Sequence, residues 1–440
     1  MRLLTAFLVF MSFEAFITSG NYIQSGGNIA RYVSKFDELF VLTMLLISAY
    51  FLTRGHLKKY KYVLISISSL FVIIIISSIV NAVKITTILE FMLRYGKIPI
   101  IILYVLIKNI DKNQLYMVLR KYIVLLATLQ FFINLLWAVG IKIIPNIRID
   151  SPDDWAIGTL GNTLLVAFVG MIAISTLLYE NYYHKIPRWK KYLNLLIIIL
   201  LIIQIYWSRS HHLTVIGIAV FSVIGFMNIL STRKNIITIL FISMVISGVG
   251  IRYIMSSSYV NISHQIDRLS LSPKWISTYE SIFLLPSTSP YVIFGVGPGQ
   301  GGSFIAKENP TSITQNLFLP YESAKIRKGS IITLTFTGIN TIASELGLVG
   351  LLWYLLTVAL LSLHLFKTEE STGGGLAISK NITIVTIINI FFLESIMIDL
   401  FQHTIIPVIL ACYIVCVVKS NPISLNQRVS NVVENDFQTG

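Results

Sequence analysis

Residues 193–207 read LNLLIIILLIIQIYW, an almost unbroken run of Leu and Ile that ends at the polar turn 208–212, SRSHH. Similar runs recur along the whole 440-residue chain, whose mean hydropathy is +0.77. Hydrophobic residues make up 55% of the sequence and charged residues only 12%, too few to cover the surface of a water-soluble fold of this size. The sequence therefore predicts an all-α, polytopic integral membrane protein.

About twelve stretches approach the roughly 20 apolar residues that a helix needs to cross the hydrocarbon core. They lie near 3–18, 37–53, 62–83, 86–107, 122–142, 160–179, 193–207, 213–230, 236–254, 337–366, 382–401 and 403–418. This pattern divides the chain into transmembrane helices over 1–254, a large outer loop over 255–336, further transmembrane helices over 337–418 and a cytoplasmic tail over 419–440.

The net charge of +14 comes from short basic clusters between the apolar runs, so nucleic-acid binding is not expected. Each basic link follows an even-numbered span, as Lys58 and Lys59 follow the second and Arg188 and Lys190 follow the sixth. The positive-inside rule places all these links in the cytoplasm. Both termini are then cytoplasmic, and 255–336 lies outside, where a loop too long for a simple connector is typical of binding or catalysis.

The cysteines and glycines exclude two kinds of site. Cys412 and Cys416 lie inside an apolar run, so we expect small core- or lipid-facing residues and no disulfide, metal site or cofactor. Gly297, Gly299 and Gly302 spell G-x-G-x-x-G, but the βαβ context and the partner carboxylate of a dinucleotide fold are missing. A tight turn that brings backbone close to a substrate is the better interpretation.

Two polar groups are candidates for chemistry at the outer surface. Asp399 and His403 stand at i and i+4, where a carboxylate can orient an imidazole and raise its basicity, as a general base requires. Arg209 can hold phosphate oxygens through its planar fork, and His211 beside it is a rival base. The structural alternatives are a hydrogen bond near the interface for the first group, and an interfacial Arg beside solvated histidines for the second.

Charged residues also occur within the predicted spans. Glu90, Arg94 and Lys97 stand at i, i+4 and i+7, and they either pair internally or line a polar cavity for a charged lipid. Glu345 lies toward the outer end of its span, where helix capping and cavity lining both explain it. Ionisable residues at membrane depth are candidates for function.

Four segments together resemble the O-antigen polymerase and ligase superfamily, in particular Wzy-type repeat-unit polymerases. They occur in family order over about 145–352. The segments are Arg148 with Ile157-Gly158-Thr159-Leu160-Gly161-Asn162; Trp207-Ser208-Arg209; Arg268 through Trp275 to Ile293-Phe294-Gly295-Val296-Gly297; and Asn340 with Glu345-Leu346-Gly347-Leu348-Val349-Gly350.

The resemblance implies an inverting, metal-independent glycosyl transfer at the outer leaflet of the bacterial inner membrane. The donor would be a glycan on undecaprenyl diphosphate, and the acceptor a hydroxyl of another lipid-linked repeat unit. The product would be O-antigen, capsule or exopolysaccharide, and a chain-length regulator and the flippase of the same pathway are the implied partners. Arg209, Arg268 and Arg148 would bind the diphosphate, and Asn162, Gly295, Gly297, Asn340 and Glu345 would complete the substrate site.

The sequence also departs from the family pattern. Ligases place a His directly before the Asn of the fourth segment, whereas residue 339 here is Ile, which disfavours the ligase branch. Lys274 is a rival to Arg268 because it stands closer to Trp275. A polysaccharide or lipid flippase of similar size and span count is the alternative from another class of protein, although a flippase needs no large outer loop.

Overall fold

The computed structural model describes the chain in segments, and all regular structure within them is helical, as predicted. The described residues are 2–19, 36–53, 61–108, 110–141, 156, 158–160, 163–183, 186–208, 210, 213–221, 291–301, 303, 305–306, 338–369, 382–384, 386–391 and 405–417. The helices are α1 (Arg2–Ser19), α3 (Phe36–Phe51), α4 (Lys61–Val80), α5 (Ile85–Tyr95), α6 (Lys97–Ile107), α7 (Lys112–Ala138), η3 (Gly158–Leu160), α8 (Thr163–Tyr183), α9 (Arg188–Trp207), α14 (Tyr291–Phe294), α17 (Gly338–Glu369) and α19 (Ile405–Val417).

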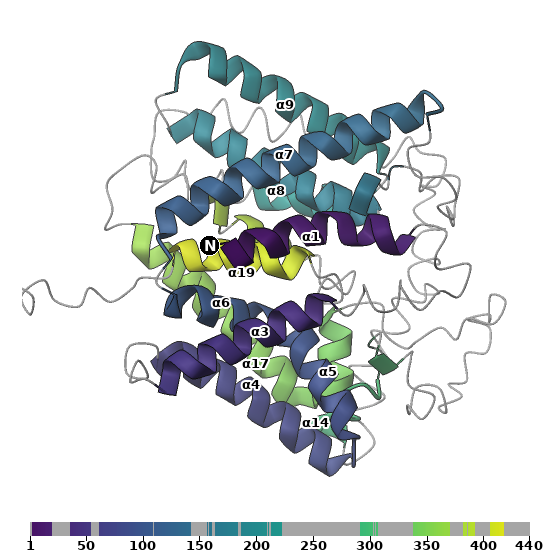
Figure 1. Ribbon diagram of the computed structural model, residues 1–440, viewed down its shortest axis with the longest axis vertical. Helices are drawn as coiled ribbons and strands as arrows, with labels where there is room; N and C mark the ends of the chain where they lie inside the picture. The colour runs from purple at the N-terminus through teal and green to yellow at the C-terminus, as the bar shows by residue number, and fades with distance from the viewer. Residues whose placement is uncertain are drawn as a thin grey trace, which may run out of the picture.

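The helices form two groups with a shared middle. In Figure 1, α7, α8 and α9 lie together at the top of the view, whereas α3, α4, α5, α14 and α17 gather at the bottom. Between them lie α1, α6 and α19, and the N-terminus lies beside α19. Cys412 and Cys416 are buried residues of α19, so the core-facing alternative describes them.

Among the described residues, three helices are long and apolar enough to cross a membrane: α7, α8 and α9. In α9 the polarity is inverted relative to a soluble helix, because Asn194 and Gln204 are buried while Leu196 and Ile202 are exposed. Water would penalise such an apolar outer face, whereas lipid chains match it. The exposed face of α9 therefore has the character of a lipid-facing surface.

The boundaries of α7 correct the predicted span over 122–142. The helix begins ten residues earlier, at Lys112, because the Asp111 side chain accepts hydrogen bonds from the backbone N–H groups of Asn113 (2.9 Å) and Gln114 (3.5 Å). Arg120 therefore lies within the helix rather than in a link, and its Nε donates to Glu180 Oε2 of α8 at 2.9 Å. With 27 residues, the helix is longer than the hydrocarbon core requires.

The predicted span over 86–107 is not one continuous helix, because the chain breaks at Gly96 into α5 and α6. Pro99 explains the break, since a proline ring clashes with the carbonyl group four residues earlier, which here belongs to Tyr95. Each half has 11 residues, or about 16 Å of helix, which is too short to cross the membrane alone.

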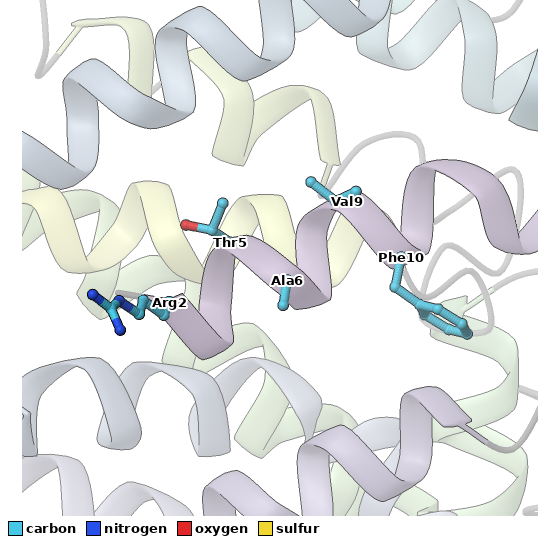
Figure 2. A pocket seen from close by; sticks show the side chains of 5 residues that line it. All are labelled: Arg2, Thr5, Ala6, Val9 and Phe10. Carbon is cyan, nitrogen blue, oxygen red and sulfur yellow. The ribbon is translucent and has the colours of Figure 1, made fainter.

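A shallow hollow of about 570 Å³ lies along α1, lined by Arg2, Thr5, Ala6, Val9 and Phe10. Figure 2 shows these side chains on successive turns of α1, with Arg2 at one end and Phe10 at the other. None of the residues predicted for the substrate site lines it.

Candidate functional site

Most residues predicted for the site lie outside the described part of the chain: Arg148, Asn162, Arg209, His211, Arg268, Asp399 and His403. Asn340 is described only as part of the first turn of α17. The diphosphate and general-base assignments therefore stay predictions. Gly295, Gly297 and Glu345 have described surroundings, and these surroundings bring the third and fourth segments of the resemblance into direct contact.

Glu345 lies inside α17, is 0% exposed, and holds a loop of glycines with its carboxyl group. One oxygen, Oε2, accepts from the backbone N–H of Gly299 at 2.7 Å. The other, Oε1, accepts from the backbone N–H groups of Gly301 at 3.2 Å and Ser303 at 3.0 Å. Backbone N–H groups that converge on one carboxylate leave no room for side chains, which explains why the sequence here is so rich in glycine.

The backbones of the two segments also pair directly. The Val296 N–H donates to Ser344 O at 2.8 Å, and the Gly297 N–H donates to Glu345 O at 3.1 Å. Two residues beyond Glu345, α17 is kinked at Gly347, where φ is +67° and ψ is −161°. We call residues 294–301, 303 and 344–347 the glycine clamp.

The two backbone segments of the glycine clamp lie too close together to admit a Cβ atom on Gly295 or Gly347. On Gly295, whose φ is +68°, a Cβ would lie 2.5 Å from the carbonyl oxygen of Ser344. On Gly347, a Cβ would meet the backbone of Ile293 and Gly295 in turn. Both glycines are therefore required by a left-handed conformation and by close approach of two backbones.

The end of α4 fastens the glycine clamp from a third side. The Ser77 hydroxyl lies 2.5 Å from Phe294 O and 3.0 Å from Glu345 O, so it can donate to either carbonyl. The Asn81 Nδ2 donates to Gly295 O at 3.0 Å and to Ser77 O at 2.8 Å. Hydrogen bonds thus hold the end of α4 to both segments of the glycine clamp, which lie more than 200 residues further along the chain.

Glu345 is buried in the structure, and both of its carboxyl oxygens accept hydrogen bonds from backbone N–H groups. A carboxylate held in this way fixes the position of the segment that follows α14. The glycine turn, which the sequence predicts to bring backbone close to a substrate, brings its backbone against α17.

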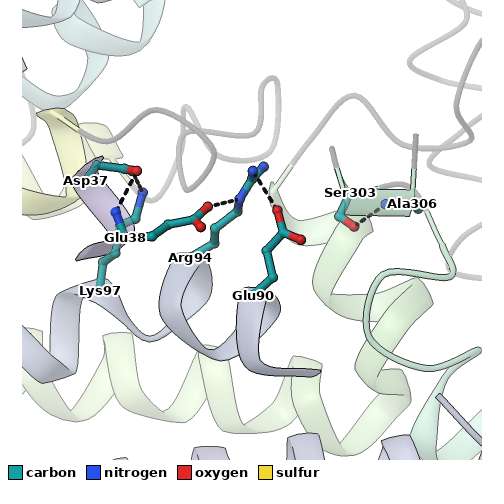
Figure 3. A network of polar contacts seen from close by, with 7 residues as sticks. All are labelled: Asp37, Glu38, Glu90, Arg94, Lys97, Ser303 and Ala306. Carbon is teal, nitrogen blue, oxygen red and sulfur yellow. Dashed lines mark hydrogen bonds and ion pairs between the residues drawn. The ribbon is translucent and has the colours of Figure 1, made fainter. Parts of the chain in front are cut away.

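A chain of ion pairs lies beside the glycine clamp. Lys97 Nζ is buried and contacts Asp37 Oδ2 of α3 at 2.6 Å. Arg94 bridges two helices, with Glu38 Oε1 of α3 at 2.9 Å and Glu90 Oε1 of α5 at 2.9 Å. Figure 3 shows the five side chains in a row, with Ser303 and Ala306 on the Glu90 side.

The ion pairs answer the question that the sequence left open for this helix. Glu90 and Arg94 do pair internally, whereas Lys97 pairs across to α3. Burying a charged pair is costly unless both partners are satisfied, and losing one partner of such a pair is strongly destabilising. These ion pairs hold the two short helices α5 and α6 against α3, beside the glycine clamp.

A second polar cluster, which the sequence analysis missed, joins α7 to the turn η3. The Gln130 side chain pairs twice with Thr159, donating through Nε2 to Oγ1 and accepting the Thr159 N–H on Oε1, each at 2.7 Å. Asn134 Oδ1 accepts the Gly158 N–H at 3.0 Å. Gly158 and Thr159 belong to the first segment of the resemblance, and two amides spaced i, i+4 within an apolar run were the available signal.

Comparison with known proteins adds no relative. No family model matches the chain, and no curated protein matches it significantly. Within the described residues, no group of three or more His, Cys, Asp or Glu side chains is placed to hold a metal ion. The functional argument therefore depends on the residues themselves and on how the fold brings them together.

Proposed function

We propose that this chain is a membrane glycosyltransferase that polymerises lipid-linked oligosaccharide repeat units. One observation carries the proposal: the glycine clamp joins Gly295 and Gly297 of the third segment to Glu345 and Gly347 of the fourth. These two segments were grouped from sequence alone, by their resemblance to Wzy-type polymerases. Their direct contact is what a shared functional site requires.

The proposed reaction needs no metal. The acceptor hydroxyl oxygen attacks the anomeric carbon of the donor, and the bond from that carbon to the diphosphate oxygen breaks with inversion. The electron pair leaves with undecaprenyl diphosphate, whose growing negative charge Arg209, Arg268 and Arg148 would stabilise. The acceptor proton goes to a base, for which His403 supported by Asp399 is the first candidate and His211 the second.

The proposed topology has about twelve spans with short cytoplasmic links, as the positive-inside rule indicates. It places both termini in the cytoplasm and 255–336 outside the bacterial inner membrane. The glycine clamp, the ends of α3 and α4 near it, and the outer end of α7 then face the leaflet that holds the lipid-linked donor. A reporter active only in the cytoplasm and fused at Ser312 is expected to be silent, and activity there would overturn this map.

Lipid-linked intermediates in a deletion strain test the function. A polymerase defect predicts carriers that each bear a single repeat unit on the outer face, where an added glycan-modifying enzyme can reach them. Repeat units trapped on the cytoplasmic face would instead indicate a flippase. Unchanged surface polymer would exclude both.

The arginine assignment has its own test within the same strain. Arg209→Lys keeps the charge and removes the planar fork, so most polymer should be lost at a normal protein level. His403→Ala should lower polymerisation by about 10²–10⁴-fold if this residue is the base. Normal polymer in His403→Ala together with loss in His211→Ala would move the base to the 208–212 turn.

A further inference from the structure

Two buried hydrogen-bond donors at the end of α7 have no partner among the described residues. They are Nδ2 of Asn134 and Nε1 of Trp137. Asn134 is 0% exposed, and the two residues stand at i and i+3, so they share one face of the helix. Buried side-chain donors are nearly always paired, and each such exception calls for a ligand, a water molecule or a functional reason.

The orientation of the Asn134 amide is fixed by its other atom. Its Oδ1 accepts the Gly158 N–H at 3.0 Å, and a flipped amide would set its NH₂ group against that donor. In the neighbouring Gln130, by contrast, both amide atoms are hydrogen-bonded, because Nε2 and Oε1 each pair with Thr159 at 2.7 Å. The free Nδ2 is therefore a consequence of how α7 holds the turn η3.

The donors match a particular ligand chemistry. Both are neutral N–H groups, which suit the oxygen atoms of an uncharged sugar, whereas a diphosphate is better matched by guanidinium groups. One belongs to an indole, whose flat apolar body can also pack against a sugar ring. Both lie at the end of α7 that the charge pattern places outside, beside the Gly158–Thr159 turn.

We propose that Asn134 and Trp137 form a glycan subsite, in which Nδ2 and Nε1 donate hydrogen bonds to oxygen atoms of the lipid-linked saccharide. This inference rests on the proposed function and adds to it the place where the sugar, rather than the diphosphate, is recognised. Its residues belong to none of the four segments of the resemblance.

The test measures binding by the full-length protein in lipid nanodiscs. One probe is the lipid-linked saccharide extracted from the deletion strain, and the other is undecaprenyl diphosphate without sugar. Trp137→Phe removes the N–H and keeps an aromatic ring, and it should weaken binding of the saccharide lipid about three- to tenfold, the worth of one hydrogen bond. Binding of the bare lipid should not change. Asn134→Asp keeps the oxygen that accepts from Gly158, and it should act in the same direction.

The matched control is Trp189→Phe at the start of α9, where the indole is 63% exposed. It should leave both affinities unchanged. Equal binding of the saccharide lipid by wild type and Trp137→Phe would show that the donors hold only water and would overturn the subsite. Equal weakening for both lipids would assign the donors to the diphosphate and overturn the sugar assignment. If the wild-type protein does not prefer the saccharide lipid, the proposed function is rejected. This outcome depends on the wild-type measurement alone.

Discussion

Glu345 and Asn134 are both fully buried polar side chains near helix ends, yet their surroundings differ. Both carboxyl oxygens of Glu345 accept backbone hydrogen bonds, and the glycines of the clamp are arranged to supply them. Asn134 has one atom paired and one atom without a partner among the described residues. A saturated polar group holds parts of the chain together, whereas an unsaturated one retains the capacity to bind something else.

The comparison assigns different roles to the two regions. The glycine clamp has the features of a structural joint. Its two segments pair backbone to backbone around a buried carboxyl group, and a Cβ atom on its glycines would overlap with neighbouring atoms. The end of α7 instead holds two buried N–H donors that have no partner among the described residues. Substitutions in the clamp should therefore lower stability first, and Trp137→Phe should change binding at little cost in stability.

The largest effect is expected for Glu345→Ala. It would leave three backbone N–H groups buried without an acceptor, and we expect a loss of about 3–9 kcal/mol of stability, at roughly 1–3 kcal/mol per orphaned donor. The apparent unfolding temperature in detergent should fall, and backbone hydrogen exchange in 296–306 should accelerate. Glu345→Gln keeps one acceptor oxygen and should lie between the alanine variant and wild type. Unchanged exchange in Glu345→Ala would contradict the structural role.

A somewhat smaller effect is expected for Gly295→Ala, measured against Gly140→Ala. Both glycines have positive φ, +68° and +89°, so both substitutions carry the strain of a left-handed backbone, about 1–2 kcal/mol. Only at Gly295 does the new Cβ also overlap with backbone, because nothing lies within 4 Å of a Cβ on Gly140. Thermal unfolding of the two variants should separate steric overlap from strain, and equal losses would show that the clamp can open to admit a methyl group.

The sequence showed part of this in advance. Gly297 and Gly299 indicated a tight turn, because closely spaced glycines are needed where backbones approach. The partner of that turn could not be predicted, since Glu345 lies 42 to 46 residues from the donors it contacts and only tertiary packing brings them together. The break at Gly96 was predictable from Pro99. A prediction based on hydropathy alone joined the two halves, because the residues on either side of the break are mostly apolar.

The amides of α7 were missed for a related reason. Gln130 and Asn134 lie within an apolar run, and polar residues at membrane depth are the usual mark of an interior or functional face. Their partners, Gly158 and Thr159, were noted only as part of a motif. The proposed diphosphate-binding and general-base residues lie outside the described segments, and they stay predictions from sequence.

A change of about 1 kcal/mol is expected for Ser77→Ala, with Ser78→Ala as its neighbour and control. Ser77 donates across the interface to the clamp, with Phe294 O at 2.5 Å, whereas the Ser78 hydroxyl bonds only within its own helix, to Ile74 O at 2.6 Å. Ser77→Ala should therefore accelerate hydrogen exchange at 294–301, and Ser78→Ala should not. Matching exchange rates in the two variants would mean that α4 does not fasten the clamp.

The smallest difference, and the sharpest comparison, is between two tryptophans. Trp353 of α17 donates through Nε1 to Ser69 Oγ of α4 at 2.9 Å, whereas Nε1 of Trp137 has no partner in the described segments. Trp353→Phe should lower stability by about 0.5–1.5 kcal/mol, because it removes a formed hydrogen bond. Trp137→Phe removes a donor that is already unpaired, so in the absence of ligand its apparent unfolding temperature should stay close to that of wild type. With the saccharide lipid bound, the gap between the two variants should close, since a ligand that binds only the folded protein stabilises it by an amount that grows with the logarithm of its affinity. Trp353→Phe would then gain the full stabilisation from ligand and Trp137→Phe would gain less. A gain of the same size in both variants would mean that the Trp137 indole takes no part in binding.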